Sequence, residues 1–169
     1  MQTSGINSGI YVAFSSLSGM WSVEQVSSKI SSYNPSVCMN KNGEGFITYA
    51  EDGPQPNPYG ISSLFKRNFS IVNGSLAMGA ETPVNQIFTI NGSYANQATP
   101  ITQINSDGNC LVFSIGNNGL TVAYGPFQDG PLQNINYISA YVGVGSPPSE
   151  TFCRFNINQS QLLLYNLVN

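Results

Sequence analysis

Short runs of β-branched and aromatic residues, bounded by Gly, Pro, Asn and Asp, recur along the whole chain. Runs of this composition are typical of β-strands. No segment carries an apolar stripe at 3.6-residue spacing that is long enough for a helix. We therefore predict an all-β protein, and its clearest strands are expected at residues 10–14, 46–49, 111–113, 120–124 and 162–165.

Two stretches of the chain, residues 34–49 and 99–114, match each other at a constant offset of 65 residues. The coinciding positions are Pro35 with Pro100, Asn40 with Asn105, Gly43 with Gly108 and, further on, Tyr59-Gly60 with Tyr124-Gly125. A fixed offset of this length is typical of repeat architectures, so the first hypothesis is a repeated all-β unit.

Three copies of the unit can be laid along residues 1–169, which we treat as a single domain. The copies span approximately residues 34–97, residues 98–145, and residues 146–169 together with 1–33. In the first copy, strands are expected near residues 36–40, 45–50, 59–66 and 84–90, with residues 52–58 and 73–83 as additional loop.

The third copy is divided between the two ends of the chain. Residues 151–153 and 161–165 resemble 36–38 and 46–50, whereas residues 10–14 and 25–27 resemble 120–124 and 137–139. A unit shared in this way is the usual means of closing a ring of blades. Three blades are too few for a ring, which needs about four to eight. We expect either that two chains combine or that the sequence is part of a larger protein.

Two Asn- and Gly-rich segments, residues 40–44 and 105–109, lie between predicted strands. Asn-Gly and Asp-Gly supply the positive φ angles that tight hairpins need, so both segments are predicted turns. The oxygen side chains of Asn105, Asp107 and Asn109 also begin like a calcium-binding loop. The distal glutamate of such a loop is missing, which favours the hairpin interpretation.

Three motifs resemble the repeat of bacterial β-propeller proteins: Trp-Ser-Val-Glu-Gln-Val-Ser-Ser at 21–28, Asn-Pro-Ser-Val at 34–37 and Asn-Gly-Glu-Gly-Phe at 42–46. The resemblance implies propeller-type four-stranded antiparallel blades, lectin-like or sialidase-like, with about three per chain that oligomerisation completes. A β-sandwich of similar strands is the alternative. The tryptophan occurs only once, and the Ser-x-Asp-x-Gly-x-x-Trp box of sialidase-type propellers is absent.

Composition narrows the possible partners. Charged residues make up 8% of the chain, the net charge is −3, and the single basic pair Lys66-Arg67 offers no footprint for nucleic acid. No run approaches 18 apolar residues, so membrane insertion is not expected. The low charge and the resemblance to surface-associated repeats favour a secreted or cell-surface protein. The odd number of cysteines and the lack of an apparent secretory signal point the other way.

The three cysteines, Cys38, Cys110 and Cys153, cannot all pair within one monomer and have no metal-ligand spacing. They fall at different positions of the repeat, and positions in different repeats are expected to lie far apart. We predict buried, reduced thiols, and we expect neither a metal nor a cofactor.

The chain contains no histidine, which excludes Ser-His-Asp and Cys-His catalysis and His-ligated metal sites. A sialidase-like site would need three arginines, and only Arg67 and Arg154 exist. The carboxylates lie mostly at predicted turns or strand ends, where we expect solvent exposure: Glu24, Glu44, Glu51, Asp52, Glu81, Asp107, Asp129 and Glu150. We predict no catalytic residues, and a glycosidase using two of these carboxylates is the less favoured alternative.

A binding role fits the residue inventory better. Aromatic faces, amides and hydroxyls recognise neutral sugars, and the chain is rich in Tyr, Asn, Gln and Ser. The candidate ligand-binding residues are Trp21, Tyr33, Tyr59 and Tyr124, although such aromatics can equally pack between blades. We predict a non-enzymatic, lectin-like binding module that binds glycans and associates with itself. The alternative is a structural or protein-protein interaction scaffold without a small ligand.

Overall fold

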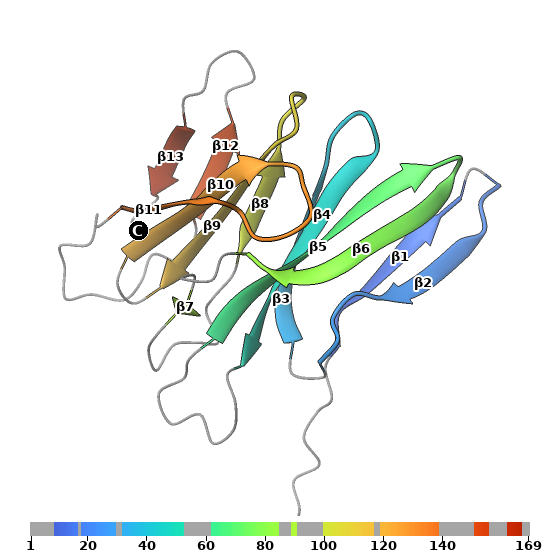
Figure 1. Ribbon diagram of the computed structural model, residues 1–169, viewed down its shortest axis with the longest axis horizontal. Helices are drawn as coiled ribbons and strands as arrows, with labels where there is room; N and C mark the ends of the chain where they lie inside the picture. The colour runs from blue at the N-terminus through green and yellow to red at the C-terminus, as the bar shows by residue number, and fades with distance from the viewer. Residues whose placement is uncertain are drawn as a thin grey trace, which may run out of the picture.

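The computed structural model describes residues 9–16, 18–29, 32–52, 62–84, 89–90, 100–116, 119–138, 151–155 and 162–166. Within these residues all regular secondary structure is β-strand and the strands pair in an antiparallel manner, which confirms the all-β prediction. The strands form four sheets, which succeed one another from the N-terminal hairpin to the C-terminal strands (Figure 1). The described strands do not close into a ring.

Two of the sheets are large. The first contains β3 (Ser32–Met39), β4 (Glu44–Asp52), β5 (Ser62–Val72) and β6 (Ser75–Pro83) in that order, and the short β7 (Thr89–Ile90) also pairs with β5. The second contains β8 (Ile101–Ile104), β9 (Asn109–Gly116), β10 (Gly119–Pro126) and β11 (Asn134–Ile138). Two smaller sheets are the hairpin of β1 (Tyr11–Ser15) with β2 (Trp21–Gln25) and the pair of β12 (Thr151–Phe155) with β13 (Leu162–Asn166).

The two predicted turns share the same hydrogen bonds. In each turn the side-chain oxygen of the first asparagine, Asn40 or Asn105, accepts hydrogen bonds from the backbone N–H groups two and four residues later, over 2.8 to 3.1 Å. Gly43 and Gly108 adopt φ angles of 79° and 77°, which glycine reaches without strain. Because the asparagine oxygens already accept backbone protons, the hairpin interpretation of both segments is confirmed.

The offset of 65 residues ends after the second strand of the repeat. Ile47 on β4 is equivalent to Val112 on β9, but Ile47 pairs with Arg67, whereas Val112 pairs with Ala123. The third strands are therefore related by an offset of 56 residues, the difference between 123 and 67. The path from β9 to β10 is correspondingly shorter than the path from β4 to β5.

The predicted match of Tyr59-Gly60 with Tyr124-Gly125 is consequently wrong. At the structural offset, Tyr124 corresponds to Asn68 on β5, and Tyr59 lies outside the described residues. Only the inner two strands of the unit keep their spacing, because the connection between the second and third strands carries the length difference.

The segment 73–83, expected as a loop, is instead the turn and outer strand of the first sheet. Asn73 and Gly74 adopt φ angles of 52° and 75° and connect β5 to β6. Asn-Gly between two strand-forming runs is a strong hairpin signal that the prediction overlooked. Of the strand expected at 84–90, only β7 lies among the described strands.

The two small sheets have the registers expected of two halves of a repeat unit. Tyr11 on β1 lies opposite Gln25, just as Thr121 on β10 lies opposite Tyr137. The pair β12 and β13 has the register of β3 and β4, with a cysteine opposite an apolar residue in each. The two halves do not join within one chain, and Figure 1 shows them on opposite sides of the two large sheets.

Strand β4 is buried on both faces. Phe46 and Ala50 pack on one side against a core that includes Val112 and Ala123 of the second large sheet. Ile47 and Tyr49 point to the other side, toward the hairpin of β1 and β2. The residues of this second core are Ile10, Val26, Ile47, Tyr49 and Phe69, with Val12, Phe65, Leu76 and Met78 partly buried against them. The first large sheet is therefore the central layer of three.

The layers stack head to tail. Ile47 and Val112 are equivalent residues, and each faces the layer that precedes its own sheet in the chain. Phe46 and its equivalent Leu111 point the opposite way, toward the layer that follows. A two-sheet sandwich would leave the outer face of each sheet to solvent, whereas here the second face of the first sheet is also covered.

Replacing Gly108 by Ala is expected to lower the free energy of unfolding by about 1–2 kcal/mol, because alanine resists the left-handed conformation. A Cβ atom there would meet only the Phe127 Cβ at 3.8 Å, so the cost is backbone strain. Gly43→Ala should cost more, because its Cβ would lie 3.3 Å from that of Ile71. Urea unfolding measures both. Gly108→Asn is the control and should lose less, and a G108A variant as stable as wild type would contradict the turn geometry.

Candidate functional site

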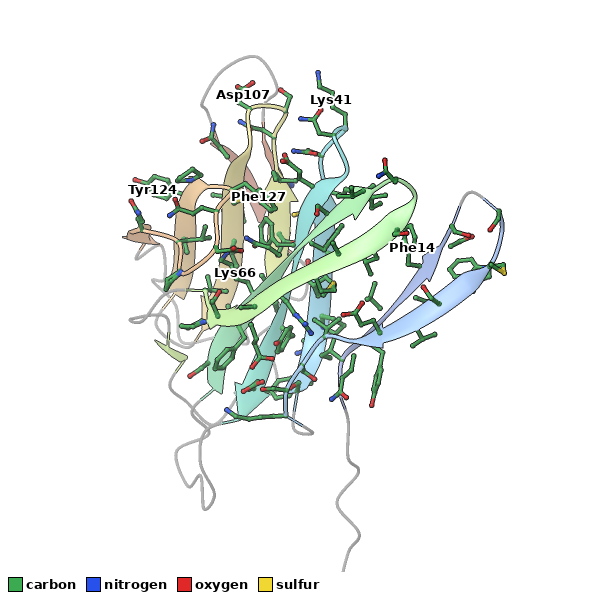
Figure 2. All side chains as sticks on the ribbon, turned by 45° about the vertical axis from the view of Figure 1, so that its right-hand side comes forward. Phe14, Lys41, Lys66, Asp107, Tyr124 and Phe127 are labelled. Atoms are coloured by element: carbon green, nitrogen blue, oxygen red, sulfur yellow. The ribbon has the colours of Figure 1, made fainter. Side chains whose placement is uncertain are left out.

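The described ligand-binding candidates lie on three different sheets. The Trp21 side chain on β2 is 71% exposed, Tyr124 on β10 is 39% exposed, and Tyr33 on β3 packs against the core between the two large sheets. Figure 2 shows Tyr124 on the opposite side of the molecule from Phe14, which lies on the hairpin that carries Trp21. The structure does not bring these three aromatic residues together, and Tyr59 lies outside the described residues.

The hairpin of β1 and β2 is held against the first large sheet by a carboxylate on β6. Glu81 accepts hydrogen bonds from the backbone N–H of Ser28 at 2.7 Å, from the Ser28 hydroxyl at 2.6 Å and from the Tyr49 hydroxyl. Burial raises the pKa of Tyr49 strongly, and the hydrogen bond to Glu81 raises it further, so the phenol stays protonated. This contact joins the segment after β2 to the middle of the sheet.

The pKa of Glu81 is lowered from its ordinary value. Burial alone would raise that pKa, but the hydrogen bonds from Ser28 and Tyr49 and the nearby Lys29 charge stabilise the carboxylate more strongly. Glu81 therefore remains ionised as an acceptor for the hairpin. Sequence reasoning missed this residue because it had placed residues 73–83 in a loop.

Arg67 on β5 makes a second connection to the hairpin. Its Nε donates to the Gly79 carbonyl at 2.7 Å, and its Nη1 donates to the carbonyls of Gln25 at 2.9 Å and Val26 at 3.3 Å. The exposed carboxylate of Glu24 lies 4.0 Å from Nη2. The guanidinium donors of this arginine are thus directed to backbone oxygens rather than toward an open site.

Glu51 corrects the prediction that the carboxylates lie in solvent. Its side chain is 1% exposed, and its Oε2 lies 2.7 Å from the Lys29 ammonium group. The Ser32 hydroxyl donates to the other carboxylate oxygen at 3.3 Å, and the Lys29 nitrogen lies 5.2 Å from the centre of the Phe65 ring. An ion pair with one buried partner and one exposed partner has a structural role at the edge of the first sheet.

Lys66 is buried between the two large sheets, with 2% of its surface exposed (labelled in Figure 2). Its ammonium group donates to the Asn68 side-chain oxygen and to the Gln128 carbonyl, both at 3.0 Å. The Asn68 amide donates to the same Gln128 carbonyl at 2.8 Å and to Asp129 at 3.3 Å. Burial lowers the pKa of Lys66, while Cys110 and Asp129 oppose that shift. The cluster holds the segment after β10 against β5.

Cys38 and Cys110 are free thiols, which confirms the prediction for the two cysteines whose side chains are described. Cys38 packs against the same core cluster as Cys110, so the expectation that they lie far apart is wrong. Burial raises the pKa of Cys38 to about 11 and that of Cys110 to about 12. Both thiols therefore act as small apolar core residues.

One surface of the hairpin is apolar and exposed. Because side chains alternate across a strand, Tyr11, Trp21 and Val23 share the face that points away from the first sheet. Their exposed fractions are 61%, 71% and 70%. We call these three residues the hairpin face. Among the candidate aromatics, only Trp21 belongs to it.

No group of three or more His, Cys, Asp or Glu residues that could hold a metal ion occurs in the described ranges. Nor does any described helix have the length and apolar character needed to span a membrane. The chain matches no protein family, and neither a curated protein nor a solved structure matches it.

We predict that Glu81→Gln weakens the docking of the hairpin in a pH-dependent manner. Because the folded pKa of Glu81 is lowered, the stabilisation is present above its unfolded pKa, about 4.5, and is lost as pH falls through the folded value. The difference in unfolding free energy between wild type and E81Q should therefore shrink as pH falls below about 4.5. Urea unfolding at pH 7 and in acid measures it.

Glu24→Gln is the matched control, since its ion pair with Arg67 is long and exposed and should contribute little. Equal stability of E81Q and wild type at pH 7 would show that the Glu81 contacts do not hold the hairpin.

The thiols of Cys38 and Cys110 should be unreactive toward a thiol reagent at pH 8 in the folded protein. Their raised pKa values leave about a thousandth or less of each as thiolate, and burial blocks access. A Cys153→Ser variant isolates the two thiols, and both should react rapidly after unfolding in urea. Rapid labelling of either thiol without denaturant would place it at an accessible surface.

Proposed function

We propose that the chain is a non-enzymatic binding module made of propeller-type blades, and that it acts as a scaffold that binds other protein chains. The head-to-tail stacking of its sheets is the observation that carries this proposal. A stack in which each layer presents the same face to its predecessor has no self-limiting end, so it continues into further layers or closes into a ring.

The arrangement of the sheets supports propeller-type blades. Two complete four-strand units share the same turn between their first and second strands, and one half unit lies at each end of the described chain. Together these amount to three blades per chain. Two chains would supply six, which is within the range of about four to eight that closed rings use. A homodimer is therefore the assembly we favour.

The use of the polar residues supports a non-enzymatic role. Glu81, Arg67 and Lys66 are the ionisable groups with the most side-chain hydrogen bonds described above, and each of them fastens one layer or segment to another. The chain has no histidine to supply acid-base chemistry near neutral pH.

Carbohydrate binding is the second candidate function. The observation that favours it is the exposure of Trp21, since an open indole ring on a surface rich in neutral hydrogen-bonding groups is suited to the C–H face of a sugar. Fold alone does not separate the two functions, because one architecture can host many kinds of binding site.

Light scattering of the full chain tests the scaffold, with an expected mass of about twice the 18.1 kDa of one chain. A glycan array probed with the same labelled sample tests the second candidate. A dimer that binds no glycan supports the scaffold. A monomer that binds glycans supports the lectin-like function, and a monomer that binds none overturns both.

A further inference from the structure

The exposed apolar side chains of this chain are not scattered. Within the described residues, eight large apolar side chains are exposed, and six of them lie on three surfaces that the stack of sheets leaves uncovered. They are Tyr11, Trp21 and Val23 on the hairpin, Val37 and Met39 on β3, and Tyr124 on β10. A cluster of exposed apolar residues marks an interaction surface more reliably than isolated ones do.

The first surface is the hairpin face. Ala13 lies opposite Val23 on this face and corresponds to Ala123 of the second large sheet. Ala123 is completely buried against the first sheet. The hairpin face is therefore the repeat equivalent of a surface that is buried where its neighbouring layer is present.

The second surface is the inner strand of the first sheet. Val37 lies opposite Ile47, so both point toward the side on which the hairpin packs. The core beneath the hairpin draws residues from β4, β5 and β6. The hairpin thus covers the outer strands, and Val37 and Met39 on β3 remain 62% and 52% exposed.

The third surface is the outer part of the second sheet. Leu111, Phe113 and Val122 are buried on the face that points away from the first sheet, and Tyr124 on the same face is 39% exposed. Strand β12 lies near β8, the inner strand of this sheet. The C-terminal pair of strands therefore approaches the inner edge and leaves β10 open.

Each end of the chain thus has half of a four-strand unit, and each half leaves uncovered the area that the other half would cover. We propose that β1 of one copy pairs with the free edge of β13 of a second copy, which forms a composite sheet in the order β12, β13, β1, β2. In this sheet the hairpin face covers Tyr124 of the copy that supplies β12 and β13, and those two strands cover Val37 and Met39 of the copy that supplies the hairpin. The inference rests on the proposed scaffold function and names its partner as a second copy of this chain.

The register of the composite sheet follows from the repeat. Ala13 corresponds to Ala123, which pairs with Val112. Tyr165 occupies the place of Val112, because it lies opposite Phe152 as Ile47 lies opposite Val37. Ala13 of one copy should therefore lie opposite Tyr165 of the other.

The two surfaces are also matched in charge. The residues of β1 and β2 that share the hairpin face are all neutral, as are those of the second sheet that share the face of Tyr124 on β8, β9 and β10. No charge needs to be desolvated when these two faces meet, so apolar burial can drive the contact.

The test places a charge on each side of the junction. Val23→Lys and Tyr124→Lys each put an ammonium group into the proposed contact, so each variant alone should have half the wild-type mass by light scattering. Val72→Lys is the matched control, because Val72 is 54% exposed and lies outside the three surfaces. Circular dichroism should show all three variants folded, since the substituted side chains are exposed in the single chain.

Mixing the two disrupted variants gives the decisive measurement. V23K retains an intact Tyr124 surface and Y124K retains an intact hairpin face, so one junction can form, and the mixture should recover a two-chain species that neither variant forms alone. A dimeric wild type whose V23K and Y124K variants keep its mass would overturn this junction and leave the scaffold proposal standing. A wild type that is monomeric throughout would overturn both. Loss of glycan binding in V23K with unchanged mass would assign the hairpin face to carbohydrate instead.

Discussion

Strand β4 imposes the constraint on which the rest of the structure depends. Phe46 and Ala50 on one face and Ile47 and Tyr49 on the other are almost completely buried, so neither face of this strand can meet water. Each face needs its own apolar layer, because burial of these side chains is the main favourable term in folding. The second large sheet supplies one layer and the N-terminal hairpin supplies the other. Stacking is thus a consequence of one strand that is apolar on both sides.

Polar contacts then determine how the layers are placed. Glu81 and Arg67 join the hairpin to the first sheet through Ser28 and backbone carbonyls, and Lys66 joins the first sheet to the segment after β10. In a chain with 8% charged residues, several of the few ionisable groups are used in this way. Buried charges of this kind are acceptable only when hydrogen-bonded, and they specify one arrangement of layers among those that apolar packing alone would allow.

Trp21 is the residue at which the two proposed functions meet. An exposed indole can hold a sugar or can be covered by another protein chain, and both outcomes would explain its position on the hairpin face. Its neighbours favour the protein partner, since Tyr11 and Val23 extend the apolar area beside it and Val23 carries no hydrogen-bonding group. The relation of this face to the buried Ala123 gives the same answer from the repeat.

The sequence by itself determined the features that local chemistry controls. Asn40, Asn105 and the glycines three residues after them specify the turns, and the strand-forming runs specify the antiparallel pairs, because these depend on hydrogen bonds and φ angles within a few residues. The tertiary structure alone decided the rest: the change of offset in the third strand, the burial of Glu51 and the use of Glu81 as an anchor. These depend on which layer faces which, and such contacts join residues as far apart as Ser28 and Glu81, whose proximity no local pattern encodes.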